Sequence, residues 1–166
     1  QASGELTGMK IAYVEIDTLL AQYNFCIDLN EGMVKKSENV RLTLNQKARE
    51  LDKQKQDFQT KYQNNAYLSP ERAQQEYNRI AKLEQDLQTL SNKLQSELMS
   101  ENEKNSLQLR DSINAFLKEY NKTKGYSMII SNTGFDNLLY ADSIYNITKE
   151  IVEGLNARYS SPAPKK

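Results

Sequence analysis

The chain has 166 residues, of which 22 are basic and 22 acidic, so its formal net charge is zero. That balance argues against a nucleic-acid-binding protein, which needs a basic surplus on one face. The sequence contains no histidine, which excludes a Ser-His-Asp triad, a His-activated cysteine nucleophile and a His-ligated metal site within one chain. Its single cysteine, Cys26, cannot form an internal disulfide or a cysteine-cluster metal site. We therefore expect no enzyme and no cofactor.

The first part of the chain predicts a tail, a strand and a short helix. Residues 1–8 are mostly small or polar, and we expect a disordered N-terminal tail there. Met9–Ile16 is rich in β-forming residues with partial alternation, which predicts a strand. Asp17 is expected to cap a short helix that runs to Tyr23. We expect a kink over residues 24–30, before a long helix begins.

The middle of the chain predicts a helical hairpin. Residues 33–124 contain no glycine and a single proline, Pro70, in a stretch rich in Leu, Lys, Glu, Gln, Arg and Ala. Such a stretch predicts two long helices joined at one bend. Ser69 is placed to cap the second helix, with Pro70 at its first position. We therefore predict an antiparallel hairpin arm over residues 31–123 with its tip near residues 64–70.

The apolar spacing in both helices is that of a narrow coiled-coil seam. Apolar residues recur every seven positions, at Leu44, Leu51 and Phe58 in the first helix and at Ala73, Ile80, Leu87 and Leu94 in the second. Lys55 falls within this seam, which predicts packing that is partly open to water. Asn102 and Asn105 either set the register and oligomeric state or line a watery gap between diverging helices. We expect marginally stable arms that can splay.

The last part of the chain predicts two strands and a final helix. Gly125 is expected to end the long helix, and Tyr126–Ser131 reads as a strand. Turn residues follow, and Asn137–Tyr140 reads as a returning strand. Asn146 or Thr148 is expected to cap an amphipathic helix with apolar positions Ile147, Ile151, Val152 and Leu155.

The two ends must meet, because a hairpin returns the chain to its start. We predict an α+β, mostly α fold, in which the arm projects from a small β-rich head made of residues 9–30 and 124–159. Residues 160–166 are expected to form a disordered C-terminal tail. Three short strands and two short helices bury too little apolar surface to anchor arms of about 70 Å, at 1.5 Å per residue. We therefore expect the heads to assemble into an oligomer.

Both ends of the sequence resemble a known family. The opening KIAYVEIDTLL (Lys10–Leu20) is similar to the start of the Skp/OmpH family of periplasmic chaperones. The closing segments GYSMIIS (Gly125–Ser131), LLYAD (Leu138–Asp142) and NITKEIVEGLN (Asn146–Asn156) are similar to its end. The resemblance runs from about residue 9 to 159. It implies a homotrimer with a β-rich body and three helical arms, whose cavity holds unfolded outer-membrane proteins without nucleotide.

The resemblance also implies a periplasmic location. The polar start Gln1–Gly4 resembles the tether that follows a processed or lipid-modified residue, so attachment to a membrane through a preceding residue is an expectation. The best-known family members are strongly basic, whereas here residues 31–68 carry eight basic and five acidic residues and residues 69–123 carry eight and nine. Membrane contact through a positive arm is therefore possible but not supported by the charge.

Four aromatic residues surround the predicted tip: Phe58, Tyr62, Tyr67 and Tyr77. Tyrosine offers apolar area with a polar end, so these side chains are candidates for contact with unfolded clients. The alternative is that Phe58, Tyr62 and Tyr77 pack in the seam and hold the tip together. For Tyr67, at the bend, the two interpretations are balanced.

The cysteine and the carboxylate pairs are better explained by structural roles than by functional ones. Cys26 lies in the apolar segment Phe25–Ile27, which favours a buried, unreactive thiol over a reactive or intermolecularly paired one. Carboxylate pairs such as Asp52/Asp57 are typical of a solvated helix face. The resemblance implies an ATP-independent holdase chaperone of the cell envelope, which is the function that we expect. The alternative function is a structural coiled-coil spacer or tether that binds a folded partner.

Overall fold

The computed structural model describes residues 8–134 and 137–160. Of the two expected disordered tails, all residues but Gly8 and Ser160 lie outside the described part of the chain. The elements follow in the order β1, α1, α2, α3, β2, a 3-10 helix η1 and α4. The fold is mostly helical, with two long helices and one small pair of strands, in agreement with the predicted class.

The chain divides into two compact units. The terminal unit combines the residues up to Glu31 with those from Lys104 onward, and the hairpin unit spans Gly32–Glu103. The last part of the predicted arm, residues 104–123, therefore clusters with the terminal unit.

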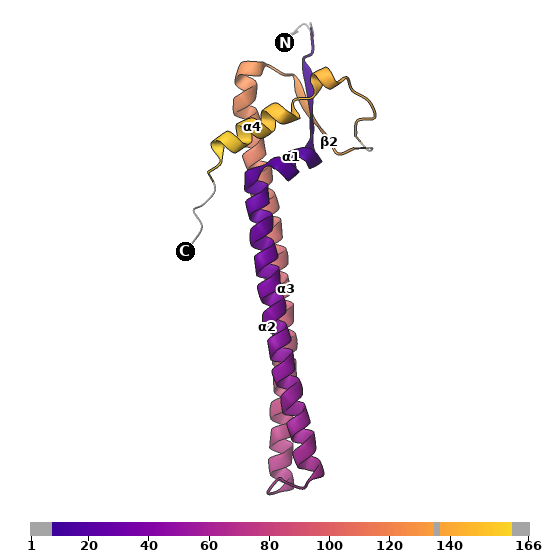
Figure 1. The fold of residues 1–166 in the computed structure, drawn as a ribbon, viewed down its shortest axis with the longest axis vertical. Helices are drawn as coiled ribbons and strands as arrows, with labels where there is room; N and C mark the ends of the chain where they lie inside the picture. The colour runs from indigo at the N-terminus through magenta and orange to yellow at the C-terminus, as the bar shows by residue number, and fades with distance from the viewer. Residues whose placement is uncertain (1–7, 135–136, 161–166) are drawn as a thin grey trace, which may run out of the picture. The chain divides into compact units, whose positions relative to one another are not determined.

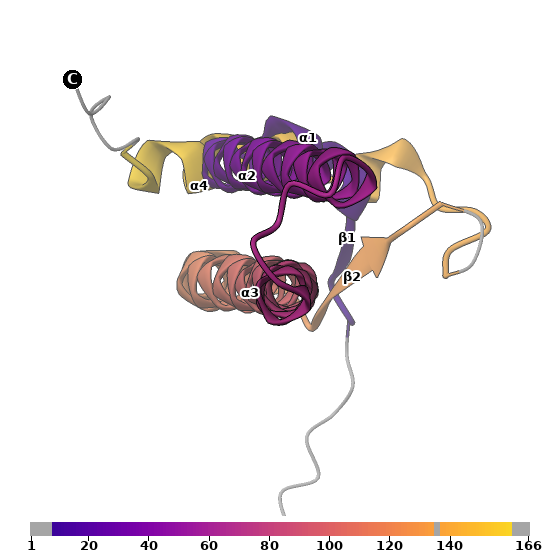
Figure 2. The ribbon, with the colours of Figure 1, turned by 90° about the horizontal axis from the view of Figure 1, so that it is seen from below.

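The sheet of the terminal unit has two strands. β1 (Ile11–Glu15) pairs in parallel with β2 (Met128–Asn132), and Ile11 lies opposite Met128. Figure 2 shows the two strands side by side. On its other edge β1 makes a single bridge, from Tyr13 to Asn146. Within the described residues, β2 has a neighbouring strand on one edge only.

The prediction of a returning strand over Asn137–Tyr140 was wrong. This segment forms a turn and irregular backbone, with Leu139 82% and Tyr140 85% exposed. Its contact with β2 is made by a side chain, because Asn137 Nδ2 donates to the carbonyl of Ser131 at 3.5 Å. A short apolar segment forms a strand where a neighbouring backbone pairs with it and a core covers one of its faces. The described part of this chain offers the segment neither.

The predictions for the first helices also need correction. α1 (Ile16–Gln22) begins before Asp17, and Glu15 at its N-terminus makes no side-chain capping bond. The backbone N–H of Glu15 donates to Thr148 Oγ1 at 2.9 Å, so a residue distant in the sequence provides a hydrogen bond at the start of α1. Asp17 lies in the first turn, where its charge still favours the helix N-terminus.

The expected kink over residues 24–30 is replaced by a break at one residue. α2 (Asn24–Gln63) starts directly after Tyr23, which has an extended backbone with ψ of 113°. The Tyr23 side chain is buried, and its hydroxyl lies 2.8 Å from Ser112 Oγ. The chain therefore turns at a side chain that is anchored in the core.

A short turn joins the two long helices of the hairpin unit. Asn65 adopts φ of 50° just after α2 ends, and α3 (Pro70–Lys124) starts at the proline. Ser69 Oγ accepts the N–H of Arg72 at 3.3 Å, which is an N-capping bond. In Figure 1 α2 and α3 both run along the length of the hairpin unit. Lys36–Glu101 and Lys55–Glu84 ion pairs join the two helices, an order that makes them antiparallel.

The core of the terminal unit is formed by β1, α1, the start of α2 with Cys26, α3 around Ile113, and α4 (Thr148–Arg158). Its innermost side chains are Leu19, Ile151 and Leu155. The predicted cap at Asn146 or Thr148 was wrong in position, because Ile147 is the N-cap residue of α4 and makes no side-chain bond there. Asn146 Oδ1, one residue earlier, accepts the N–H of Thr148 at 3.0 Å. The apolar positions predicted for this helix, Ile147, Ile151, Val152 and Leu155, are all buried.

Cys26 belongs to the same core. Its side chain is 5% exposed, which confirms the predicted burial. Burial raises the pKa of the thiol, while a hydrogen bond from Asn30 opposes this effect. A raised pKa reduces the thiolate fraction at neutral pH, so the thiol is a poor nucleophile.

Candidate functional site

The four aromatic residues predicted around the tip form one cluster centred on Phe58. Its ring centroid lies 5.9 Å from that of Tyr62, 5.6 Å from Tyr67 and 6.2 Å from Tyr77. These rings come from α2, the turn and α3, so the cluster joins both helices at the end of the hairpin. We call these four residues the tip cluster.

The tip cluster holds the helices together and also presents open rings. Phe58 is half-buried between the helices, whereas Tyr62 is 63% and Tyr77 57% exposed. A groove of about 400 Å³ opens here, lined by Phe58, Tyr62, Pro70, Ala73, Gln74 and Tyr77. The seam-packing interpretation therefore fits Phe58, and the two exposed tyrosines leave apolar area for a ligand.

The sequence interpretation missed Leu68 as a surface residue. It lies in the turn next to Tyr67 and is 92% exposed, the highest value among the exposed large hydrophobic residues. A leucine among turn-forming residues such as Asn65 and Pro70 was the available signal, because no helical face could bury it. Together with the exposed tyrosines it makes the end of the hairpin apolar.

A fixed charge pair flanks Tyr67. Arg79 Nε donates to Glu76 Oε2 at 3.0 Å, and this hydrogen bond lowers the pKa of the Glu76 carboxyl. Desolvation raises the pKa of Tyr67, and the Glu76 carboxylate adds to that rise. Tyr67 therefore keeps its proton at neutral pH and offers a hydroxyl donor beside a charged pair. These groups support binding by apolar and polar contact.

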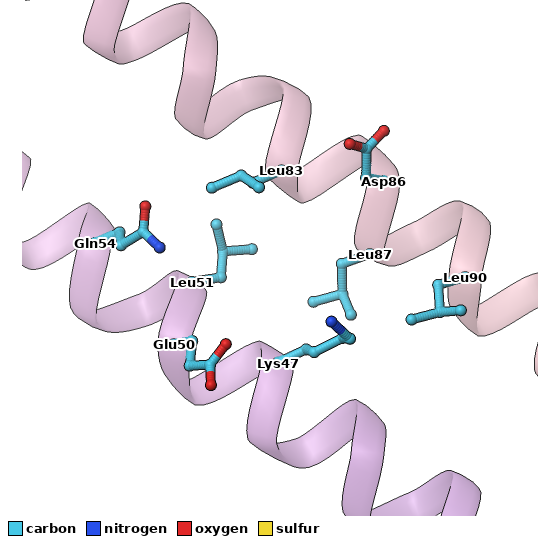
Figure 3. Close-up of a pocket in the computed structure, with 8 residues that line it drawn as sticks. All are labelled: Lys47, Glu50, Leu51, Gln54, Leu83, Asp86, Leu87 and Leu90. Carbon is cyan, nitrogen blue, oxygen red and sulfur yellow. The ribbon is translucent and has the colours of Figure 1, made fainter.

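A second hollow lies in the seam of the hairpin unit. Leu51, Leu83, Leu87 and Leu90 surround a space of about 150 Å³, with Gln54 at its edge and the exposed Lys47, Glu50 and Asp86 around it. In Figure 3 the four leucine side chains and the Gln54 amide lie between α2 and α3, whereas the Asp86 carboxylate points away from α2. We call this space the leucine pit. The predicted openness of this seam to water is also visible at Lys55, which donates to Glu84 at 2.8 Å.

The two seam asparagines differ in their surroundings. Asn105 is half-buried and Asn102 is exposed. This difference does not support an identical role for both in setting the register of the helices.

The terminal unit carries an exposed apolar patch. Its members are the exposed large side chains near both strands and η1 (Ser143–Tyr145), namely Met9, Met128, Leu139, Tyr140, Ile144 and Tyr145. Three of them, Met9, Tyr140 and Tyr145, line a hollow of about 540 Å³ together with Ile11, Ile130 and Leu138. We call this surface the terminal patch. A patch of this kind on a protein surface usually marks a contact with another molecule.

The described residues form neither a metal site nor a membrane-spanning helix. No group of three or more His, Cys, Asp or Glu side chains in the described ranges is arranged to hold a metal ion. No helix in this part of the chain is long and apolar enough to cross a membrane.

The match to one family model places the chain in a known family. The model of the family described as outer membrane protein (OmpH-like) matches residues 10–155. The proposed OmpH-like outer membrane chaperone of Caulobacter crescentus CB15 has a similar structure, with a TM-score of 0.80 at 12% identity over 96% of this chain and 90% of that one. At this identity the likeness establishes the fold. No curated protein matches the sequence.

Proposed function

Because the chain belongs to the OmpH-like outer membrane protein family, we propose that it is an ATP-independent holdase chaperone of the cell envelope. In this proposal it works in the periplasm as a homotrimer and holds unfolded outer-membrane proteins between its helical arms. It performs no chemical step. The observation that carries the proposal is the tip cluster, in which Tyr62 and Tyr77 are more than half exposed beside an open groove.

Contacts at the tip cluster suit a holdase because each is weak. Covering about 50 Å² of apolar surface on one tyrosine gains about 1 kcal/mol. A single contact of this size is easily reversed, so a client is not trapped on one site. Several arms acting on the same client raise the effective concentration of binding surface and make capture efficient. The exposed Leu68 adds to this surface at the turn.

The terminal patch supports the proposed oligomer. Ile144 is 75% exposed and Leu139 82%, and burial against a second copy would remove both from water. β2 also has one edge without a neighbouring strand among the described residues. Strand edges of this kind readily accept a strand from another chain. A second copy of this chain is therefore the partner that we propose for the terminal patch.

The holdase function can be tested with the tip cluster. A urea-denatured β-barrel outer-membrane protein is diluted into buffer with or without the full chain, and aggregation is followed by light scattering. We expect the wild-type chain to suppress aggregation and a variant with Tyr62, Tyr67 and Tyr77 replaced by Ser to suppress it less. Helicity by circular dichroism and mass by light scattering should stay near the wild-type values.

A matched control replaces three other exposed apolar residues of the hairpin unit, Val34, Leu42 and Met99, by Ser. This variant should protect the client as well as the wild type does. If the tyrosine variant loses helicity in parallel with protection, the tip cluster is only structural. If wild-type protein does not slow aggregation at all, the spacer or tether function becomes the better explanation.

A further inference from the structure

We propose that the leucine pit is a second client-binding subsite, specific for one aromatic or branched aliphatic side chain of an extended polypeptide. The side chain enters the space between Leu51, Leu83, Leu87 and Leu90, and a neighbouring backbone N–H of the same segment donates to Gln54 Oε1. The inference rests on the proposed holdase function and names a site for it away from the tip cluster.

The size of the pit selects one side chain. Its volume is about 150 Å³, the size at which a leucine- and phenylalanine-lined cavity in a protein core binds benzene. Sites for drug-sized molecules start at about 300 Å³. The four leucines supply an apolar lining, so a phenyl or isobutyl group gains more here than a polar one.

A hydrogen-bond acceptor at the edge of the leucine pit, the side-chain oxygen of Gln54, receives no hydrogen bond from the described residues. This oxygen, Gln54 Oε1, is buried. In Figure 3 the Gln54 amide lies in the space between the two helices, next to Leu51 and facing Leu83. A buried acceptor without a partner costs free energy, which is recovered when the Gln54 side chain turns its oxygen toward a donor from a ligand in the pit. The ligand that fits the pit best therefore carries an N–H donor next to an apolar side chain.

An extended segment meets this requirement better than a helix does. In an unfolded chain every apolar side chain has a free backbone N–H next to it, whereas a helix uses its N–H groups internally. A docking helix also needs a row of hollows one turn apart. The charges around the pit nearly cancel, since Lys47 and Glu50 carry opposite charges and Asp86 is paired with Lys82 at 3.1 Å. An uncharged segment fits such a site.

The test uses small probes on the full chain. N-acetyl-phenylalaninamide is titrated while the leucine methyl groups are followed by ¹³C-resolved NMR. Its fully N-methylated analogue, which has no N–H donor, and N-acetyl-glycinamide serve as comparison probes. We expect shifts at Leu51, Leu83 and Leu87 with the first probe, about fivefold weaker binding of the N-methylated analogue, and no binding of the glycine probe.

Two glutamine variants complete the test. Gln54→Leu should make the amide and its N-methylated analogue bind equally, because the acceptor is gone. Gln56→Leu, on the exposed side of the same helix, should leave the fivefold difference unchanged. Circular dichroism reports whether each variant keeps its helicity, and the wild-type titration does not depend on either variant folding.

Two results would overturn the inference. One is the absence of leucine methyl shifts with N-acetyl-phenylalaninamide, which would mean that the pit holds water only. The other is equal binding of all three probes to the wild-type chain. If either result appears while the chain still protects its client, only the pit is refuted. If the chain does not protect the client but the probe binds, the holdase function fails and the pit remains as a site.

Discussion

A Cβ atom placed on Gly154 would lie 2.3 Å from Cζ of Phe116, closer than carbon atoms approach in folded proteins. Within the terminal unit, α4 can therefore lie against the Phe116 ring because position 154 has no side chain. The guanidinium of Arg158, one turn further along α4, lies 5.7 Å from the centroid of the same ring. These contacts fix how closely the last helix approaches the phenylalanine.

The first prediction compares two glycines in helices. Gly154→Ala should lower the free energy of unfolding by about 1–3 kcal/mol, because the half-buried Phe116 ring must move to admit the methyl group. Gly32→Ala in α2 should raise it by about 0.5–1 kcal/mol, because nothing lies within 4 Å of the added atom and alanine favours the helix. Urea unfolding of both variants measures the difference. Equal urea midpoints for the two variants would show that the Phe116 ring moves without cost to admit the methyl group.

The second prediction concerns Asn156, whose amide bridges the break between α1 and α2. Its Nδ2 donates to the carbonyl of Gln22 at 3.0 Å, and its Oδ1 accepts the N–H of Asn24 at 2.8 Å. Asn156→Ala should lower the free energy of unfolding by about 1–2 kcal/mol, since both groups lose a partner at a partly exposed site.

Asn92→Ala is the matched control for this bridge. Asn92 is exposed within α3 and accepts a side-chain bond from Gln88, so alanine there should be neutral or slightly stabilising. Thermal unfolding followed by circular dichroism compares the two variants. A melting temperature for the Asn156 variant at or above that of the control would refute the bridge.

The third prediction is a loss of stability at alkaline pH. Burial and the hydrogen bond from its hydroxyl to Asp28, 2.8 Å long, raise the pKa of Tyr159 to about 12. A phenol with a folded-state pKa above its usual value near 10 stabilises the fold below pH 10 and stops doing so as pH rises to 12. Burial also raises the pKa of Tyr120, which acts in the same direction.

Urea unfolding between pH 8 and 12 checks this prediction. Tyr159→Phe should be less stable than the wild type at pH 8, by about 1 kcal/mol for the lost bond. The gap should narrow above pH 10, because only the wild type loses this contribution. Tyr140→Phe, at a side chain 85% exposed, should follow the wild-type curve. A constant gap from pH 8 to 12 would show that Tyr159 does not titrate with unfolding.

The fourth prediction addresses the terminal patch. Ile144→Asp should lower the mass in solution, measured by light scattering, toward that of one chain, because a carboxylate would be buried at the proposed contact between copies. The side chain is 75% exposed within one chain, so its replacement should not unfold the terminal unit. Leu42→Asp, at a leucine 52% exposed in the hairpin unit, should leave the mass unchanged. If the mass of the Ile144→Asp variant equals that of the wild type, the contact between copies does not lie at the terminal patch.

Local sequence determined the helical part of this protein. Ser69 and Pro70 start α3, and α3 stops just before Gly125, which has φ of 70°. Capping bonds, the fixed angle of proline and the freedom of glycine act within a few residues, so they can be read without a structure. The four aromatic residues around the tip could be named for the same reason, because a predicted turn brings its flanking residues together.

Only the tertiary structure decided how the distant parts combine. Asn137–Tyr140 has the pattern of a strand and forms none, whereas Met128–Asn132 pairs with β1 across more than a hundred residues. Thr148 and Asn156 supply the hydrogen bonds at both ends of α1 that no neighbouring residue provides. The leucine pit likewise depends on where two helices leave a gap in their seam. Strand pairing, hydrogen bonds from distant residues and gaps in packing depend on which segments meet in space. The local propensities of the sequence do not determine which segments meet.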